Sequence, residues 1–320
     1  MHKNIIPIYP SRFTTKYLSN HFDIEIFLFT QCNLNCDFCE VRDKHWNFNV
    51  DYFDGIKESL CNLLPLIDDN CKTGVVKLCG GEMFFDKLIN QFNAMQYYLD
   101  LIEFINNILK QYRIQIQITT NLVHHNIDNI ISLYQNFDNI KLNVSFDFGG
   151  RFTKQKQIDL WWENYHQLLI NNINFSINII GTRVLYDLII QNKYSKCFDD
   201  FKQNNTNINI LEYFGNNSKY LISADQFAFM VSQLYKKYGD IICVNKLTDK
   251  QCANCAITNF EITPEYVSWD CCNKLQSFHQ FFLKNNCIQC EYFANCRISC
   301  GNNAFEGTCF NKTINQLCFK

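Results

Sequence analysis

Residues 23–39 read DIEIFLFTQCNLNCDFC, a β-rich run followed closely by three cysteines. The apolar and β-branched content of 23–30 predicts a buried strand. The cysteines are Cys32, Cys36 and Cys39, in the spacing C-x3-C-x2-C. Because thiolates bind zinc and iron–sulfur clusters, the segment predicts a strand whose carboxyl end carries a metal-binding loop.

Strand-like and helix-like segments alternate from this point to about residue 240. Strands are expected at 75–79, 113–120, 141–146, 175–181 and 207–214, and helices at 48–67, 94–111, 157–171, 184–203 and 223–239. Asn49 or Asp51 is the expected N-cap of the first helix. Six strands, all but the third followed by an expected helix, predict an α/β fold with a parallel sheet, here a partial (β/α)6 TIM-like barrel. An open doubly wound sheet is the alternative, and in either fold the site lies at the carboxyl ends of the strands.

Composition narrows the class of protein. The 320 residues are 47% hydrophobic and 19% charged, which predicts a large core rather than disorder. The formal net charge is −2, so the composition is not basic in the way that is typical of a nucleic-acid-binding protein. No apolar run is long enough for a membrane span, and the first residues lack the apolar region of a secretory signal. We therefore expect a cytoplasmic protein with neither a membrane nor a nucleic acid as partner.

The chain contains 18 cysteines, and ten of them lie in residues 251–320. A cytoplasmic chain does not keep a disulfide framework, so this density indicates metal binding. Three parts are expected: an N-terminal extension at 1–22, the barrel at 23–240 and a cysteine-rich iron–sulfur domain at 241–320.

The C-terminal part holds a second cysteine pattern, C-x2-C-x5-C-x3-C. Its members are Cys287, Cys290, Cys296 and Cys300; Cys252, Cys255, Cys271 and Cys272 precede it, and Cys309 and Cys318 follow it. Eight thiolates fill two closed four-ligand sites. Two zinc ions, two four-iron clusters, or one of each would satisfy that ligand count.

The first cysteine loop, with Phe38 before its third cysteine, resembles the cluster-binding loop of radical S-adenosylmethionine enzymes. The resemblance implies a [4Fe-4S] cluster held by Cys32, Cys36 and Cys39, whose open iron binds the amino and carboxylate groups of S-adenosylmethionine. Reductive cleavage then yields a 5′-deoxyadenosyl radical that removes a substrate hydrogen atom. The non-family alternative is a zinc site completed by a distant fourth ligand.

Gly80-Gly81-Glu82, after the second strand, is similar to the family's Gly-Gly-Glu motif, which holds the methionyl ammonium. Cys79 replaces the usual preceding Thr, and Met83 replaces the usual following Pro.

Polar residues at the ends of later strands also match the family pattern. The resemblance implies cofactor contacts from Asn121 after the third strand, and from Ser145 and Asp147 at the end of the fourth. The alternatives without cofactor contact are purely structural roles: a helix cap for Asn121 and a turn for Asp147.

The second pattern resembles the SPASM extension of the same family, which carries two auxiliary [4Fe-4S] clusters. The resemblance implies an outer cluster held by Cys287, Cys290, Cys296 and Cys318, and an inner one held by Cys300, Cys252, Cys255 and Cys271. Cys309 is an alternative to Cys318, and Cys272 is an alternative to Cys271.

Three functions are compatible with these patterns. The favoured one is a radical enzyme that oxidises or cross-links a side chain of a peptide or protein. Its expected partners are that substrate, a separate peptide-recognition protein, and a reductant such as flavodoxin or ferredoxin. The alternatives are a radical dehydrogenase of a small molecule, such as an amino sugar or alcohol, and a zinc-stapled binding module without enzymatic activity. No residue pattern singles out a catalytic acid or base.

Overall fold

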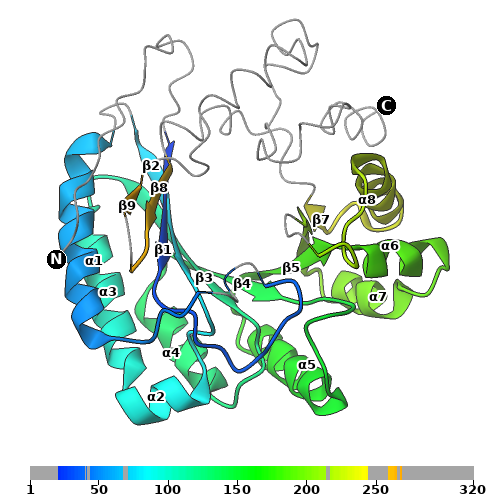
Figure 1. Ribbon diagram of the computed structural model, residues 1–320, viewed down its shortest axis with the longest axis horizontal. Helices are drawn as coiled ribbons and strands as arrows, with labels where there is room; N and C mark the ends of the chain where they lie inside the picture. The colour runs from blue at the N-terminus through cyan, green and yellow to red at the C-terminus, as the bar shows by residue number, and fades with distance from the viewer. Residues whose placement is uncertain are drawn as a thin grey trace, which may run out of the picture.

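The computed structural model describes residues 21–39, 41, 44–67, 71–213, 217–243, 259–264 and 267–268. These residues form a single sheet with helices along its outer side (Figure 1). The strands are β1 (His21–Phe27), β2 (Thr73–Cys79), β3 (Arg113–Thr120), β4 (Ile140–Ser145), β5 (Phe175–Gly181), β6 (Asn207–Glu212), β7 (Ile242–Cys243), β8 (Asn259–Ile262) and β9 (Val267–Ser268). The helices are α1 (Val50–Leu63), the 3-10 turn η2 (Leu64–Leu66), α2 (Asp86–Phe92), α3 (Ala94–Ile108), α4 (Ile127–Asn136), α5 (Gln155–Ile170), α6 (Arg183–Ile190), α7 (Ser195–Gln203) and α8 (Ala224–Tyr238).

The strand order distinguishes a barrel from a doubly wound sheet. The order is β7-β6-β5-β4-β3-β2-β1-β8-β9, so the first seven strands pair in sequence, all in parallel. A doubly wound sheet reverses its order at a switch point, and this sheet does not. Because right-handed crossovers in one direction place every helix on the same face, the sheet curves into an open, partial barrel. The predicted α/β partial barrel is confirmed.

A parallel strand from the far end of the chain joins the opposite edge. β8 pairs with β1 in parallel, with Glu25 opposite Glu261, and β9 turns back antiparallel to β8. β8 lies in the range expected for the C-terminal domain, so that range contributes a strand to the barrel sheet. None of the helices in the described part of the chain combines the length and the apolar character that a bilayer-spanning helix needs.

Several element boundaries differ from the expected ones. The helix expected at 184–203 is two helices, α6 and α7, because Asn192 takes a left-handed backbone (φ 56°) between them. The helices α2 and α4 were not expected. Asn49 is the N-cap of α1, as predicted, and its side chain accepts a hydrogen bond from the backbone N–H of Asp51 at 3.0 Å.

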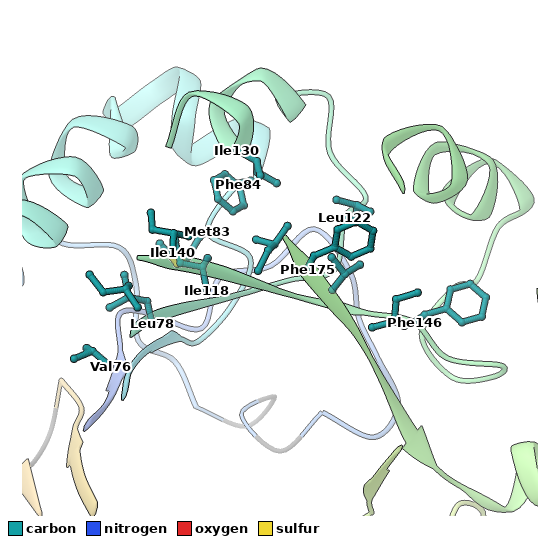
Figure 2. Close-up of a cluster of buried hydrophobic side chains, with 14 of the residues drawn as sticks. Val76, Leu78, Met83, Phe84, Ile118, Leu122, Ile130, Ile140, Phe146 and Phe175 are labelled. Carbon is teal, nitrogen blue, oxygen red and sulfur yellow. The ribbon is translucent and has the colours of Figure 1, made fainter. Parts of the chain in front are cut away.

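The core lies between the convex face of the sheet and the helices. Val76, Leu78 and Ile118 project from β2 and β3 and are fully buried, and Figure 2 shows them below Phe84 and Ile130. Burying a side chain of this size stabilises the fold by roughly 1.5–3 kcal/mol. Because strand side chains alternate between faces, the other residues of each strand line the concave face, on which none of the described helices packs.

Candidate active site

The cysteine loop begins where β1 ends and continues along the end of β2. The backbone N–H of Leu28 donates to the Cys79 carbonyl at 3.0 Å, and that of Gly81 donates to the Phe29 carbonyl at 2.7 Å. The N–H of Glu82 donates to the Gln31 carbonyl at 3.0 Å. In Figure 1 the loop, in dark blue, then crosses below the sheet toward the end of β5. The first predicted motif is therefore backbone-paired to the second.

The two glycines allow this close approach. Gly80 has a φ of +133°, and a Cβ there would lie 2.1 Å from the Phe29 carbonyl oxygen. A Cβ at Gly81 would lie 1.8 Å from the Gln31 carbonyl oxygen. Such overlap excludes any side chain at these positions without a shift of the loop. Their visible role is to admit the cysteine loop; the predicted contact with an ammonium group stays a prediction.

N–H groups approach two of the three cysteine sulfurs. The backbone N–H of Leu34 lies 3.4 Å from Cys32 Sγ, and the Asn121 side-chain amide lies 3.5 Å from it. The Arg151 guanidinium lies 3.8 Å from Cys36 Sγ. Burial raises the pKa of the Cys36 thiol, and Arg151 opposes that rise. Donors around sulfur suit thiolates that bind a metal, because such hydrogen bonds stabilise the negative charge.

The loop is not a preassembled metal site. Across the described residues, no three His, Cys, Asp or Glu side chains lie close enough together to hold a metal ion. Cys32 and Cys39 are exposed and Cys36 is buried, and all three are free thiols. The donor set nevertheless fits an iron–sulfur cluster: three thiols from one short loop, with N–H groups near two sulfurs.

Glu82 connects β2 to the end of β3. It is only 1% exposed, and its Oε1 accepts hydrogen bonds from the Thr120 hydroxyl at 2.8 Å and the Phe84 N–H at 3.1 Å. Its Oε2 accepts from the Asn121 N–H at 2.6 Å. Burial raises the pKa of Glu82 to about 7, although these donors favour the ionised form. The Glu82 carboxylate therefore lies beside the cysteine loop, and both of its oxygens accept hydrogen bonds from other residues of this chain.

Asn121 reaches the cysteine loop directly. Its side-chain amide donates to Asn33 Oδ1 at 2.8 Å, and Asn33 in turn donates to the Val123 carbonyl. Its own Oδ1 accepts from the Val123 N–H at 2.8 Å. The structure thus brings the predicted residue Asn121 to Cys32 and Glu82, as a link between the loop and β3.

Asp147 lies just beyond β4 and is held by two donors. Its Oδ2 is 2.6 Å from Arg151 Nε, and its Oδ1 accepts from the Ile180 N–H at 2.9 Å. Ser145, the last residue of β4, is 9% exposed, and its carbonyl accepts from Trp161 Nε1 at 3.0 Å. Both residues lie at the expected end of the sheet, and their predicted contacts with a ribose stay predictions.

A small aromatic cluster fixes the far part of the loop. Phe38 packs edge-on against Tyr220 with ring centroids 5.6 Å apart, and both residues are buried. The Tyr220 hydroxyl donates to Asp37 at 2.9 Å, and the Asp37 N–H donates to the Gly150 carbonyl at 2.9 Å. Sequence analysis missed Tyr220 and Arg151, since no local motif marks contacts between residues so far apart in the chain.

The concave face carries a connected row of neutral polar side chains. Asn143 donates to Gln117 at 3.2 Å and accepts from the Ser176 hydroxyl at 3.1 Å. Asn209 donates to Ser176 at 3.1 Å and to Asn178 at 2.8 Å. We call Gln117, Asn143, Ser176, Asn178 and Asn209 the amide row. Asn178 is in register with Ser145, so the amide row lies beside the candidate cofactor residues and faces the barrel interior.

The candidate auxiliary ligands lie outside the described residues. They are Cys252, Cys255, Cys271, Cys287, Cys290, Cys296, Cys300 and Cys318.

No protein-family model matches the sequence, and no curated protein matches it. Solved structures with the same fold do exist. Native anSMEcpe with bound AdoMet and the Cp18Cys peptide superposes with a TM-score of 0.65 at 13% identity, over 93% of this chain and 97% of that one. Native anSMEcpe with bound AdoMet matches at the same score and identity, over 93% and 96%.

SuiB of Streptococcus suis superposes with a TM-score of 0.52 at 14% identity, over 92% of this chain and 76% of that one. The anSMEcpe structures contain AdoMet, the cofactor that the resemblance of the cysteine loop implies. The chain therefore shares its fold with anSMEcpe and SuiB.

Proposed function

We propose that this protein is a radical S-adenosylmethionine enzyme that removes a hydrogen atom from a side chain of a peptide or protein. One observation carries the proposal: the three-cysteine loop lies at the carboxyl end of a partial barrel, paired to the Gly-Gly-Glu segment. N–H donors approach two of its sulfurs. The likeness to AdoMet-bound anSMEcpe supports it independently of the motif.

The proposed work of this chain is to hold and shield the reacting groups. A four-iron cluster with an open iron supplies, when bound, the electron that cleaves S-adenosylmethionine to a 5′-deoxyadenosyl radical. Cys32, Cys36 and Cys39 would be its ligands. Phe38 and Tyr220 would exclude water from one side of the cluster, because both rings are buried.

The cofactor contacts proposed for the remaining residues follow the strand ends. Gly80, Gly81 and Glu82 would meet the methionyl end, and Asn121, Ser145 and Asp147 would surround the rest of the molecule. All of them lie at the carboxyl ends of β2, β3 and β4, the edge where ligands bind in folds of this type.

A peptide substrate is favoured by the chemistry of the concave face. The amide row is neutral and offers paired donors and acceptors, which complement the N–H and C=O groups of a peptide backbone. Structural neighbours point the same way, since anSMEcpe was solved with a bound peptide. We therefore propose that the amide row contacts the peptide while the target side chain reaches the cofactor. A separate recognition protein and a flavodoxin- or ferredoxin-type reductant complete the proposed system.

We further propose that the C-terminal cysteines hold two auxiliary [4Fe-4S] clusters. Closed clusters of this kind carry electrons rather than bind substrate. They would accept the electron that remains after hydrogen abstraction from the substrate, as a net oxidation requires.

The test is reconstitution of the full chain under anoxia with iron and sulfide, followed by reduction in the presence of S-adenosylmethionine. We expect 5′-deoxyadenosine, and we expect it to disappear when Cys32, Cys36 and Cys39 are replaced by Ala. Cys61→Ala is the matched control, because Cys61 is an exposed thiol on α1. Nucleoside formation that persists without the three cysteines would refute the proposal, and a colourless chain with stoichiometric zinc would favour a binding module.

A further inference from the structure

Arg151 is an almost buried cation that touches both the cysteine loop and the end of β4. Its side chain is 12% exposed, and its Nε lies 2.6 Å from Asp147 Oδ2. Another guanidinium nitrogen lies 3.8 Å from Cys36 Sγ, and the guanidinium carbon is 5.3 Å from the Phe38 ring centroid. One planar group therefore meets an anion, a sulfur and an aromatic ring.

The charge of this group is fixed in place. A guanidinium does not lose its proton in proteins, so Arg151 is a permanent positive charge beside Cys36. Asp147 is only 2% exposed in its side chain, and its second oxygen is held by the Ile180 N–H. Because both partners are buried, water screens their charges weakly. Cys36 therefore experiences a nearby positive charge and, behind it, a negative one.

We propose that Arg151, held by Asp147, is a positioning residue that fixes the Cys36 thiolate and raises the reduction potential of the cluster. This rests on the proposed function, because it requires a cluster on the cysteine loop. Reduction adds negative charge to a cluster, and N–H donors and cations near its sulfurs stabilise that added charge. A neighbouring carboxylate has the opposite effect.

The two members of the pair should therefore shift the potential in opposite directions. Arg151→Met removes the cation and the donor and leaves Asp147 unbalanced, which lowers the potential. Asp147→Asn removes the anion and leaves the cation unbalanced, which raises it. A purely structural role for the pair would instead weaken iron retention in both variants and predicts no such opposition.

The experiment is a potentiometric titration of the reconstituted full chain, followed by electron paramagnetic resonance. The cluster of the first loop is identified in the wild-type chain as the one whose spectrum changes when S-adenosylmethionine is added. The same signal is then followed in each variant, and its midpoint potential is measured without the cofactor. Arg151→Lys retains the charge on a flexible stem and should lie between wild type and Arg151→Met. Arg113→Met is the control, since Arg113 is exposed at the start of β3, at the opposite end of the sheet.

We expect a lower potential in Arg151→Met, a higher one in Asp147→Asn, and no shift in Arg113→Met. An unchanged potential in Arg151→Met, or shifts of the same sign in both variants, overturns the proposal. If Arg151→Met retains no iron, Asp147→Asn decides alone, because a lower or unchanged potential there is also contradictory. A wild-type chain without any signal that responds to S-adenosylmethionine refutes the proposed function itself, and the role of Arg151 falls with it.

Discussion

The buried carboxyl of Glu82 makes stability depend on pH in a defined direction. Its folded-state pKa is about 7, above the ordinary value of 4.5, because burial disfavours the ionised form. The folded chain therefore holds this proton more tightly than the unfolded chain. The stabilisation that comes from this tighter proton binding is fully present below pH 4.5 and is lost as the pH rises through 7. A difference of about 2.5 pKa units corresponds to about 3 kcal/mol.

Glu82→Gln tests this value, because the amide does not ionise. The variant puts an amide NH2, which only donates, where the neutral carboxyl has a hydroxyl oxygen facing the Thr120, Phe84 and Asn121 donors, so it should be less stable at acidic pH. The stability difference between wild type and variant should then shrink by about 3 kcal/mol between pH 4.5 and 7.5.

The assay is urea unfolding of the reduced, metal-free chain at several pH values, followed by tryptophan fluorescence. Trp161 is fully buried against the end of β4 and reports on this region. Glu103→Gln is the control, since Glu103 is exposed on α3 and should show a constant difference. Parallel stability curves for wild type and Glu82→Gln would show that the carboxyl is not desolvated as described.

Three further substitutions test the loop and the concave face. Gly81→Ala should cost at least about 2 kcal/mol in urea unfolding and weaken iron retention, because its Cβ would overlap the Gln31 carbonyl. An effect no larger than that of Gly149→Ala, whose Cβ would have Val184 side-chain atoms as its nearest neighbours, at 3.1 Å or more, would contradict this. Tyr220→Phe should cost about 1 kcal/mol and speed hydrogen exchange at residues 36–39, since it loses the bond to Asp37; unchanged exchange would argue against an anchoring role. Asn178→Leu should slow peptide modification roughly 10-fold while uncoupled 5′-deoxyadenosine formation stays within about twofold; an equal loss of both would place the amide row outside substrate binding.

The order of the sheet could be predicted because strand periodicity is local. The expected strands at 113–120 and 175–181 coincide with β3 and β5, since alternating side chains mark them unambiguously. Helix ends were harder to predict. Asn93 separates α2 from α3, and Asn192 separates α6 from α7, in both cases through a left-handed backbone at a residue other than Gly. Asn adopts that conformation more readily than most residues, but its presence alone does not predict it.

In the candidate site too, local motifs could be predicted from the sequence and tertiary contacts could not. Cys32, Cys36, Cys39 and the Gly-Gly-Glu segment are local motifs, and their spacing was visible in the sequence. Arg151 and Tyr220 reach the loop only after the barrel brings β4 and the segment after β6 beside it. No spacing rule links Tyr220 to Asp37, 183 residues earlier. Their roles depend on tertiary contacts, which periodicity and motif spacing do not encode.

The proposed function requires that the first cysteine loop presents an open iron to S-adenosylmethionine. The most direct measurement is the electron paramagnetic resonance spectrum of the reduced, reconstituted chain before and after S-adenosylmethionine is added. We predict that the cofactor changes the spectrum of one cluster, and that this responsive signal is absent when Cys32, Cys36 and Cys39 are replaced by Ala. A spectrum that does not change when the cofactor is added, or a response that survives loss of the three thiols, would show that the first cysteine loop does not bind S-adenosylmethionine through an open iron.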